Sequence, residues 1–241
     1  MSILIKPAYD ADASAYFTTA GVTNTAGRQQ ISRFVTGIKD LGLWSNMVCW
    51  PLRSSQNAGT GTTAYSLGGL GTYNGTLTGG PTWGTDGVTF SPTNSCLQFS
   101  YVLASGSHTV LGVALNGAVV ANSQIFRVSN TLNNFHFWQR RSGVSNTSFS
   151  PNTDLSGYIN GAITNTAIAS AYNTFGATTS RTFATGTSAG TPSFFGDTGN
   201  NQQWGDIGSF ASIFNLALTT PQMLSLHNLL KTTLGQGLGL P

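Results

Sequence analysis

Apolar residues in the first part of the chain recur at the spacing of an α-helix. The stripe predicts a helix that begins at Asn24 or Thr25 and ends at Gly42. An apolar face of this kind has to pack on something, either on the body of the protein or on a neighbouring subunit. We expect it to be a face for attachment or oligomerisation, formed by Ile31, Phe34, Val35, Ile38 and Leu41.

Two further helices are predicted, one before the helix at residues 24–42 and one near the end of the given sequence. Asp10 is a suitable N-cap for a short helix over residues 11–17, which Gly21 would end. In the last part of the chain, Thr220 is the expected N-cap and Pro221 the first helical residue. The apolar face of this helix consists of Met223, Leu226, Leu230 and Leu234, and Gly235 ends it.

Between these helices the sequence has the pattern of β-strands. Apolar and β-branched runs are separated by turn residues, and no helical pattern lies between them. The expected strands are residues 47–50, 87–90, 96–101, 108–115, 125–128, 134–138, 157–159, 167–171, 181–184 and 208–214. Residues 54–81 are rich in Gly, Thr and Ser, but recurring aromatic residues indicate ordered loops with short strand pieces. Strands of this spacing predict a sandwich or a barrel.

The composition supports a mainly β protein that is solubilised by neutral groups. Charged residues make up 7% of the 241 residues, against roughly a quarter in an ordinary globular domain. All seven acidic residues are aspartates, so the chain contains no glutamate. Apolar residues at 39% and aromatic residues at 11% are sufficient for a core. Threonine favours strands, while Gly, Asn and Ser favour the turns that connect them.

Charge and hydropathy exclude two classes of partner. The net charge is +3 and Arg140-Arg141 is the only adjacent basic pair, so no basic stripe could neutralise several phosphates of a nucleic acid. No apolar run approaches the roughly 18 residues of a membrane helix, and residues 3–5 are too short for the core of a secretory signal. We therefore expect no nucleic-acid or membrane partner, and synthesis in a cytoplasm.

The cysteines and histidines do not form a catalytic or metal-binding pattern. Cys49 and Cys96 lack the spacing of metal ligands, and a cytoplasmic origin favours two buried, reduced thiols over a disulfide. His108, His136 and His227 lie in or beside strand and helix patterns. We interpret these histidines as structural.

The stretch from residue 87 to residue 230 resembles a concanavalin A-like, laminin-G-like jelly roll. The resemblance rests on residues 87–90 (GVTF) leading to 97–99 (LQF), and on the strand pair at 110–115 and 125–128. Its most specific part is a closing strand and helix, residues 205–210 (GDIGSF) followed by 213–222 (IFNLALTTPQ). It implies a mainly β fold, a concanavalin A-like jelly-roll sandwich with a short N-terminal helical segment and a C-terminal helix.

The first residues are similar to the opening of many bacteriophage virion proteins, in which a short helical segment precedes a concanavalin A-like domain. The similarity lies in residues 9–13 (YDADA) and in a helix ending with residues 38–44 (IKDLGLW). It implies a helical attachment or oligomerisation segment over residues 1–45 and a sandwich domain over residues 46–241. The implied function is that of a structural protein exposed on the phage particle, as a capsid decoration, fibre or tail component.

The same resemblance implies partners and a location. We expect a homo-oligomer, in this setting a trimer, that contacts other structural proteins of the virion after synthesis in the host cytoplasm. A glycan on the host surface is a further expected ligand, because a receptor-recognition module for host attachment is the alternative function.

Hydrolytic activity is not expected, although the fold family includes β-glucan hydrolases with two glutamates and an aspartate on one strand. Retaining hydrolysis requires two carboxyl groups roughly 5 Å apart. The chain has no glutamate, and no two aspartates alternate within one expected strand. Asp10 and Asp12 are interpreted as a helix cap and a partner of the helix dipole. We therefore expect no catalytic residues.

One polar segment, residues 197–206, is the candidate binding site. It combines carboxylates, amides and an indole in Asp197, Asn200, Asn201, Trp204 and Asp206. Such a mixture suits a glycan, because planar acceptors bind sugar hydroxyls and an aromatic face packs on C–H groups. No cofactor is expected, and Ca²⁺ on the same oxygens is the one alternative. The segment could instead be a surface turn whose Asp and Asn side chains bond their own backbone, with Trp204 in the core.

Overall fold

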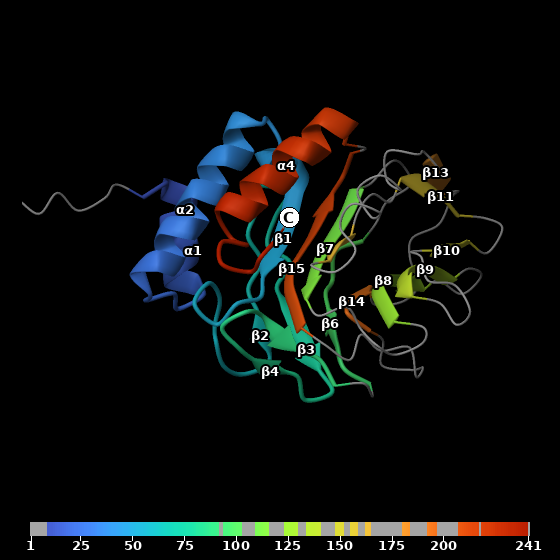
Figure 1. The fold of residues 1–241 in the computed structure, drawn as a ribbon, viewed down its shortest axis with the longest axis horizontal. Coiled ribbons are helices and arrows are strands. Elements are labelled where there is room, and N and C mark those ends of the chain that lie inside the picture. Colours follow the sequence, from blue (N-terminus) through green and yellow to red (C-terminus); the bar gives the residue numbers. More distant parts are fainter. Residues whose placement is uncertain are drawn as a thin grey trace, which may run out of the picture.

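Three α-helices lie together on one side of the strands in the described part of the chain (Figure 1). The structure is a computed structural model that describes residues 9–91, 94–102, 109–115, 123–129, 134–140, 148–151, 155–158, 162–164, 180–183, 192–196, 207–216 and 218–240. The helices are α1 (Ala11–Thr19), α2 (Thr25–Asp40) and α4 (Thr220–Thr232), and a 3₁₀ turn, η1 (Trp44–Asn46), leads from α2 into the first strand. We refer to α1, α2 and α4 as the helical layer.

Each of the three helices begins with a side-chain cap. For α1 and α2 the residue that provides it agrees with the sequence, which predicts Asp10 for α1 and Asn24 or Thr25 as the start of α2. Asp10 accepts hydrogen bonds from the backbone N–H groups of Asp12 and Ala13, and Asn24 accepts one from Gly27 at 2.8 Å. The N-cap of α4 is Thr219 rather than the expected Thr220. Thr219 and Gln222 form a reciprocal capping box, which moves the start of the helix one residue back.

The strands form two large sheets and a small one. The first sheet has the order β12-β7-β15-β5-β4 with β1 paired to β15, the second has the order β10-β9-β8-β14-β6-β3-β2, and β11 pairs with β13 in the third. The described pairs are antiparallel except β12 with β7, which is parallel. The bounds are β1 Met47–Pro51, β2 Thr63–Ala64, β3 Gly75–Thr78, β4 Thr82–Trp83, β5 Val88–Thr89, β6 Cys96–Gln98, β7 Thr109–Leu115, β8 Ser123–Ser129, β9 Asn134–Arg140, β10 Ser148–Pro151, β11 Leu155–Tyr158, β12 Ala162–Thr164, β13 Ser180–Phe183, β14 Ser193–Phe194 and β15 Ile207–Phe214.

Three strands of the first sheet, β1, β7 and β15, are buried on both faces, which explains why they are apolar without a polar alternation. Along β1, Val48 and Trp50 enter a core shared with the second sheet, while Met47 and Cys49 enter a core shared with the helical layer. Strands β7 and β15 likewise place some of their side chains in the core shared with the second sheet and others in the core shared with the helical layer. The molecule therefore has three layers, in the order helices, first sheet, second sheet.

The core between the sheets is rich in aromatic side chains. The indole ring of Trp50 lies 4.6 Å from the ring of Phe99 and 5.9 Å from that of Phe194, centroid to centroid. The indole N–H donates to the carbonyl oxygen of Tyr73 at 2.9 Å, so its polar atom is satisfied inside the core. These rings link strands that lie far apart in the sequence and fix the spacing of the two sheets.

The apolar face of α2 is not an attachment surface, and this corrects the expectation from sequence. Its side chains are fully buried within the chain, except Leu41, which is partly buried: Ile31, Phe34, Val35, Ile38 and Leu41. The ring of Phe34 meets that of Phe210 on β15 edge to face at 5.7 Å. Of the two alternatives for this face, the packing is on the body of the protein itself.

The expected division after residue 45 does not separate two cores. The core of the helical layer joins α1 and α2 to β1, β7, β15 and α4, so the N-terminal helices and the sheet are one packed unit. A body of two β-sheets is confirmed. The helices form a full layer over the first sheet, however, and are more than a short appended segment.

Most of the expected strands that fall on described residues are present, with boundaries shifted by a few residues. The expected strand at 167–171 lies outside the described residues. Sequence reasoning missed β2, β4, β10, β12 and β14, which have four residues or fewer. Such short pieces are too short to show a periodicity, and their strand geometry depends on the strand or strands with which they pair.

Candidate functional site

The polar segment that the sequence singles out connects β14 of the second sheet to β15 of the first. All of its candidate residues lie outside the described part of the chain: Asp197, Asn200, Asn201, Trp204 and Asp206. Neither a glycan-binding loop nor Ca²⁺ ligation by this segment is tested by the structure. Both remain expectations.

The aspartates of the first helices have structural contacts. Lys39 Nζ lies 2.8 Å from Asp10 Oδ2 and 2.6 Å from Asp12 Oδ2, and it stands over the ring of Trp44. Burial raises the pKa of Asp10, but the hydrogen bonds from Lys39 and from the backbone outweigh it, so the pKa is lowered. The hydrogen bonds to the two carboxylates raise the pKa of Lys39. Asp10 and Lys39 are therefore ionised at neutral pH, and the contacts of Lys39 with Asp10 and Asp12 tie the start of α1 to the end of α2.

Arg53 is a structural cation that connects three distant segments. Its Nε donates to the carbonyl oxygen of Thr85 at 2.7 Å, and its Nη1 donates to those of Leu234 at 3.2 Å and Gln236 at 2.8 Å. Desolvation lowers the pKa of Arg53, and the nearby Asp86 opposes this. The guanidinium thus donates to three backbone carbonyls, and these contacts give Arg53 a structural role.

Both cysteines are buried and neither forms a disulfide, as expected from the sequence. Burial raises the pKa of the Cys49 thiol well above its usual range, which makes it unreactive as a nucleophile. Sγ of Cys96 lies 3.1 Å from Oγ1 of Thr78. Among the residues that the structure describes, no three His, Cys, Asp or Glu side chains come together as a metal site.

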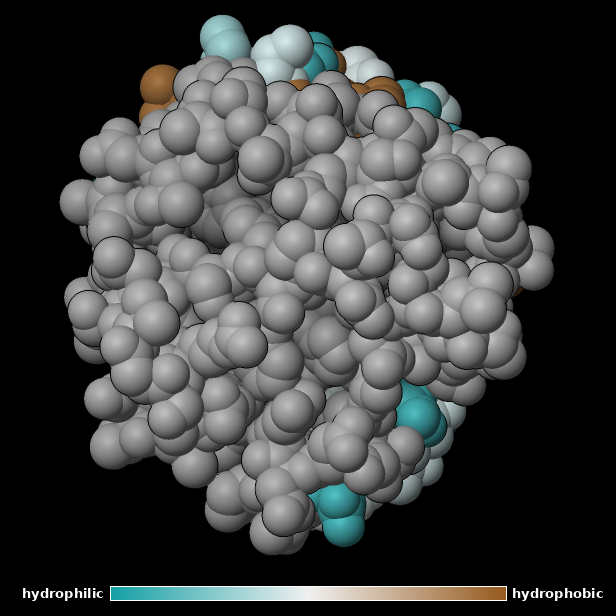
Figure 2. Space-filling view, turned by 90° about the vertical axis from the view of Figure 1, so that its right-hand side faces the viewer, coloured by the Kyte–Doolittle hydropathy of each residue, from teal (hydrophilic) through white to brown (hydrophobic). Residues whose placement is uncertain are grey.

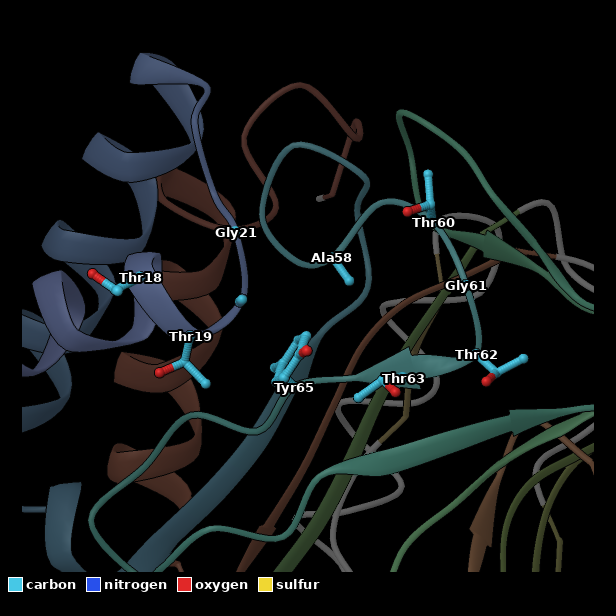
Figure 3. A pocket seen from close by; sticks show the side chains of 10 residues that line it. Thr18, Thr19, Gly21, Ala58, Thr60, Gly61, Thr62, Thr63 and Tyr65 are labelled. Carbon is cyan, nitrogen blue, oxygen red and sulfur yellow. The ribbon is translucent and has the colours of Figure 1, made fainter.

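A polar groove lies between the C-terminal end of α1 and the loop of residues 58–65 (Figure 3). We refer to it below as the groove. Its volume is about 340 Å³, and its side chains are mainly hydroxylated: Thr18, Thr19, Thr60, Thr62, Thr63 and Tyr65. Tyr65 lies between Thr19 on the helix side and Thr63 on the loop side (Figure 3). No charged residue lines it.

The loop that forms one wall of the groove is held by one buried side chain. The Oδ1 atom of Asn57 accepts hydrogen bonds from the backbone of Ala58 at 2.7 Å and of Tyr65 at 3.0 Å. Its Nδ2 atom donates to the carbonyl oxygens of Pro51 at 2.7 Å and Tyr65 at 2.9 Å. Both ends of the loop are therefore closed by a single amide that is only 2% exposed.

A second contact holds the middle of the same loop. The indole N–H of Trp83 donates to the carbonyl oxygen of Gly61 at 2.9 Å. Gly61 has a φ of +72°, a conformation that favours glycine. The groove thus has a wall whose backbone is fixed at its ends and at its centre.

The sequence does not predict the groove. It predicts only that the segment forming one of its walls is an ordered loop. Residues 54–81 were expected to form ordered loops, but nothing in the order of Thr and Gly indicates which of them face α1. The helix residues and the loop residues are about 40 positions apart, and their proximity follows from the packing of α1 on the sheet.

Figure 2 shows the face that lies to the right in Figure 1, where described residues form only the rim. Hydrophilic and hydrophobic residues meet at its upper edge, and hydrophilic residues lie at its lower right. No helix in the described part of the chain is long and apolar enough to cross a membrane.

Comparison of the chain with family models, curated proteins and solved structures gave no match.

Proposed function

We propose that this chain is a non-enzymatic structural protein of a phage particle, exposed on the virion surface as a capsid decoration, fibre or tail component. Its sandwich is proposed to be a concanavalin A-like jelly roll. The proposal takes its biological setting from the sequence resemblance, in which a helical opening is followed by strands that end in residues 205–222. Two facing sheets with antiparallel β15 at the centre of the first and a helix directly after it support the jelly-roll part.

The observation that carries the non-enzymatic part is the use of the carboxylates. The chain has no glutamate, and the described aspartates do not form an acid pair facing a cleft. Asp10 caps α1 and shares Lys39 with Asp12, while Asp86 lies in an exposed turn beside Arg53. A carboxylate neutralised by an ion pair is a poor general acid at neutral pH, since its pKa is lowered rather than raised.

Attachment to the particle is proposed to use outer surfaces, because the apolar face of α2 is internal. The exposed residues of α1 are small, and Asp12 is the one charged residue among them, which suits close packing against a neighbouring subunit where desolvating a charge is costly. A symmetric trimer that also contacts other virion proteins is the proposed assembly. Native mass measurement of the purified chain is expected to give three copies, and a monomer at high concentration would contradict this part.

The test of the function itself is the composition of the particle. Phage particles from the source culture are banded by density and their proteins are digested and identified by mass spectrometry. We expect peptides of this chain at a fixed ratio to the major capsid protein in every preparation. Their loss on repeated banding would contradict a structural role. Release of reducing ends from host polysaccharide by the purified chain would contradict the non-enzymatic part.

The second candidate function is a glycan-binding module for host attachment. It is favoured by the mixture of carboxylates, amides and an indole in residues 197–206. It predicts that the chain binds host surface polysaccharide and that Trp204→Ala or Asp197→Ala weakens this binding. Unchanged binding in both variants would remove this segment as the site.

A further inference from the structure

We propose that the groove between α1 and the loop of residues 58–65 binds a neutral oligosaccharide. This site is separate from residues 197–206 and does not depend on the chain being part of a virion. Its volume of about 340 Å³ falls in the range of small-molecule sites. Its hydroxylated lining, its lack of charged residues and the fixed position of its walls suit such a ligand.

The lining supplies hydroxyl groups from two sides. Thr18 and Thr19 lie on the last turn of α1 and donate their hydroxyl protons to the carbonyl oxygens of Ser14 and Ala15. A hydroxyl that donates in this way keeps its lone pairs for accepting, so these oxygens suit the O–H groups of a sugar. Thr60 and Thr63 provide exposed hydroxyls from the opposite wall.

An aromatic side chain lies between these walls. Tyr65 is partly buried against the helical core, so its ring is anchored, and it still lines the groove. In Figure 3 the ring is flanked by Thr19 and Thr63. An anchored aromatic ring beside hydroxyl groups is the combination that packs on the C–H face of a pyranose and orients its hydroxyls.

The charge of the groove selects against acidic ligands. No lysine, arginine or histidine lines it, so nothing there could pair with a carboxylate or sulfate group. The groove also includes the C-terminal end of α1, where the helix dipole places partial negative charge and no basic residue lies in the last turn. A neutral ligand that donates hydrogen bonds is therefore favoured over an anion.

The walls are already in place before a ligand arrives. Asn57 closes both ends of the loop and Trp83 holds Gly61, as described above. Binding therefore does not have to order this loop, which removes a large part of the usual cost of association.

The test is a titration of the purified full-length chain, followed by NMR, with cellohexaose, maltohexaose and mannohexaose as neutral probes and hexagalacturonate as the acidic probe. We expect at least one neutral probe to bind at millimolar concentration or below and to shift the backbone amides of Gly21, Gly61 and Tyr65. Those amides identify the groove and distinguish it from residues 197–206.

The matched variants remove hydroxyls without changing side-chain shape. Thr19→Val with Thr63→Val is expected to weaken binding about tenfold, since two hydrogen bonds to the sugar are lost. The control, Thr36→Val with Thr89→Val, changes one exposed helix residue and one exposed strand residue outside the groove and is expected to leave binding unchanged. No binding of any neutral probe, stronger binding of hexagalacturonate, or equal effects of the two double variants would overturn the proposal.

Discussion

Lys39 illustrates how much one side chain can organise in a chain with few charges. It binds both Asp10 and Asp12 and packs over Trp44, so that it connects the start of α1, the end of α2 and the turn before β1. The Asp10 side chain is 16% exposed and that of Lys39 is 32% exposed, so solvent screens this pair only in part. Asp10 also caps α1 through the same carboxylate.

The two roles of Asp10 are separable by substitution. Asp10→Asn keeps a capping oxygen and loses the ion pair, so we expect it to lower the free energy of unfolding by less than about 1 kcal/mol. Asp10→Ala loses both and is expected to cost about 1–2 kcal/mol. Urea unfolding at neutral pH measures both values. Equal losses in the two variants would mean that the cap contributes nothing.

The ion pair between Asp10 and Lys39 also makes the free energy of unfolding depend on pH. The pKa of Asp10 is lowered in the folded state, so its contribution is present above the unfolded value of about 3.9 and is lost as the pH falls below it. The pKa of Lys39 is raised, so its contribution persists until the pH rises above about 10.4. The stability difference between wild type and Asp10→Asn should therefore be constant between these limits and should shrink in acid. A difference that grows in acid would contradict the assignment.

At the scale of residues, local signals were readable from the sequence and long-range partners were not. The cap Asp10 was predicted correctly, and Asn24 is one of the two residues expected to start α2, because a cap acts on the backbone two or three residues away. Lys39, the partner of Asp10, is 29 positions away, and two of the three carbonyls bound by Arg53 are more than 180 positions away. Such contacts exist only once the layers have packed.

At the scale of elements, α2 has an apolar stripe and two glycines against which other parts of the chain pack closely. A Cβ atom on Gly27 would overlap the backbone carbonyl of Ser55, while one on Gly37 would meet only the side-chain tip of Leu229 on α4. The backbone before the groove loop therefore lies directly against one end of α2. At Gly37, nearer the other end of α2, the neighbour is the side chain of Leu229, which is able to adopt another rotamer.

These glycines give a matched pair of substitutions within one helix. Gly27→Ala is expected to destabilise the protein by about 3 kcal/mol, because a backbone carbonyl has to move. Gly37→Ala is expected to stay within about 1 kcal/mol of wild type, since the gain in helix propensity offsets the shift of Leu229. Thermal unfolding followed by circular dichroism compares the two. Similar effects of both variants would contradict the packing of Gly27 on Ser55.

Elements with a clear period were predictable, and elements defined by their neighbours were not. The stripe of α2 and the apolar run of β1 were both recognised, and both are present. The use of the α2 face was predicted incorrectly, since the sequence shows that the face is apolar but not what covers it. The groove was missed for the same reason, because α1 and residues 58–65 meet only through tertiary packing.

At the scale of the whole molecule, the first sheet is the shared centre of two cores. One core holds the helical layer, and the other holds the second sheet and its aromatic rings. β1 and β15 contribute to both, so a disturbance on the helix side should reach the aromatic side. We therefore expect the helical layer and the sandwich to unfold together.

Phe34→Ala tests this coupling, because Phe34 is fully buried and packs on Phe210 of β15. It is expected to cost about 3–5 kcal/mol and to lower the unfolding midpoint equally by circular dichroism and by tryptophan fluorescence. Arg33→Ala, at the exposed neighbouring position, is the control and should change stability by less than about 0.5 kcal/mol. A helical signal lost well before the fluorescence change would instead indicate an independent helical segment.

The central claim is that this chain is a structural protein exposed on the surface of a phage particle. The most direct measurement is immunogold labelling of intact, density-banded particles with an antibody raised against the purified chain. The account predicts gold at a fixed position on the outside of every particle, either over the capsid or on the tail. Unlabelled intact particles, with the protein found only in the soluble fraction of the lysate, would contradict it.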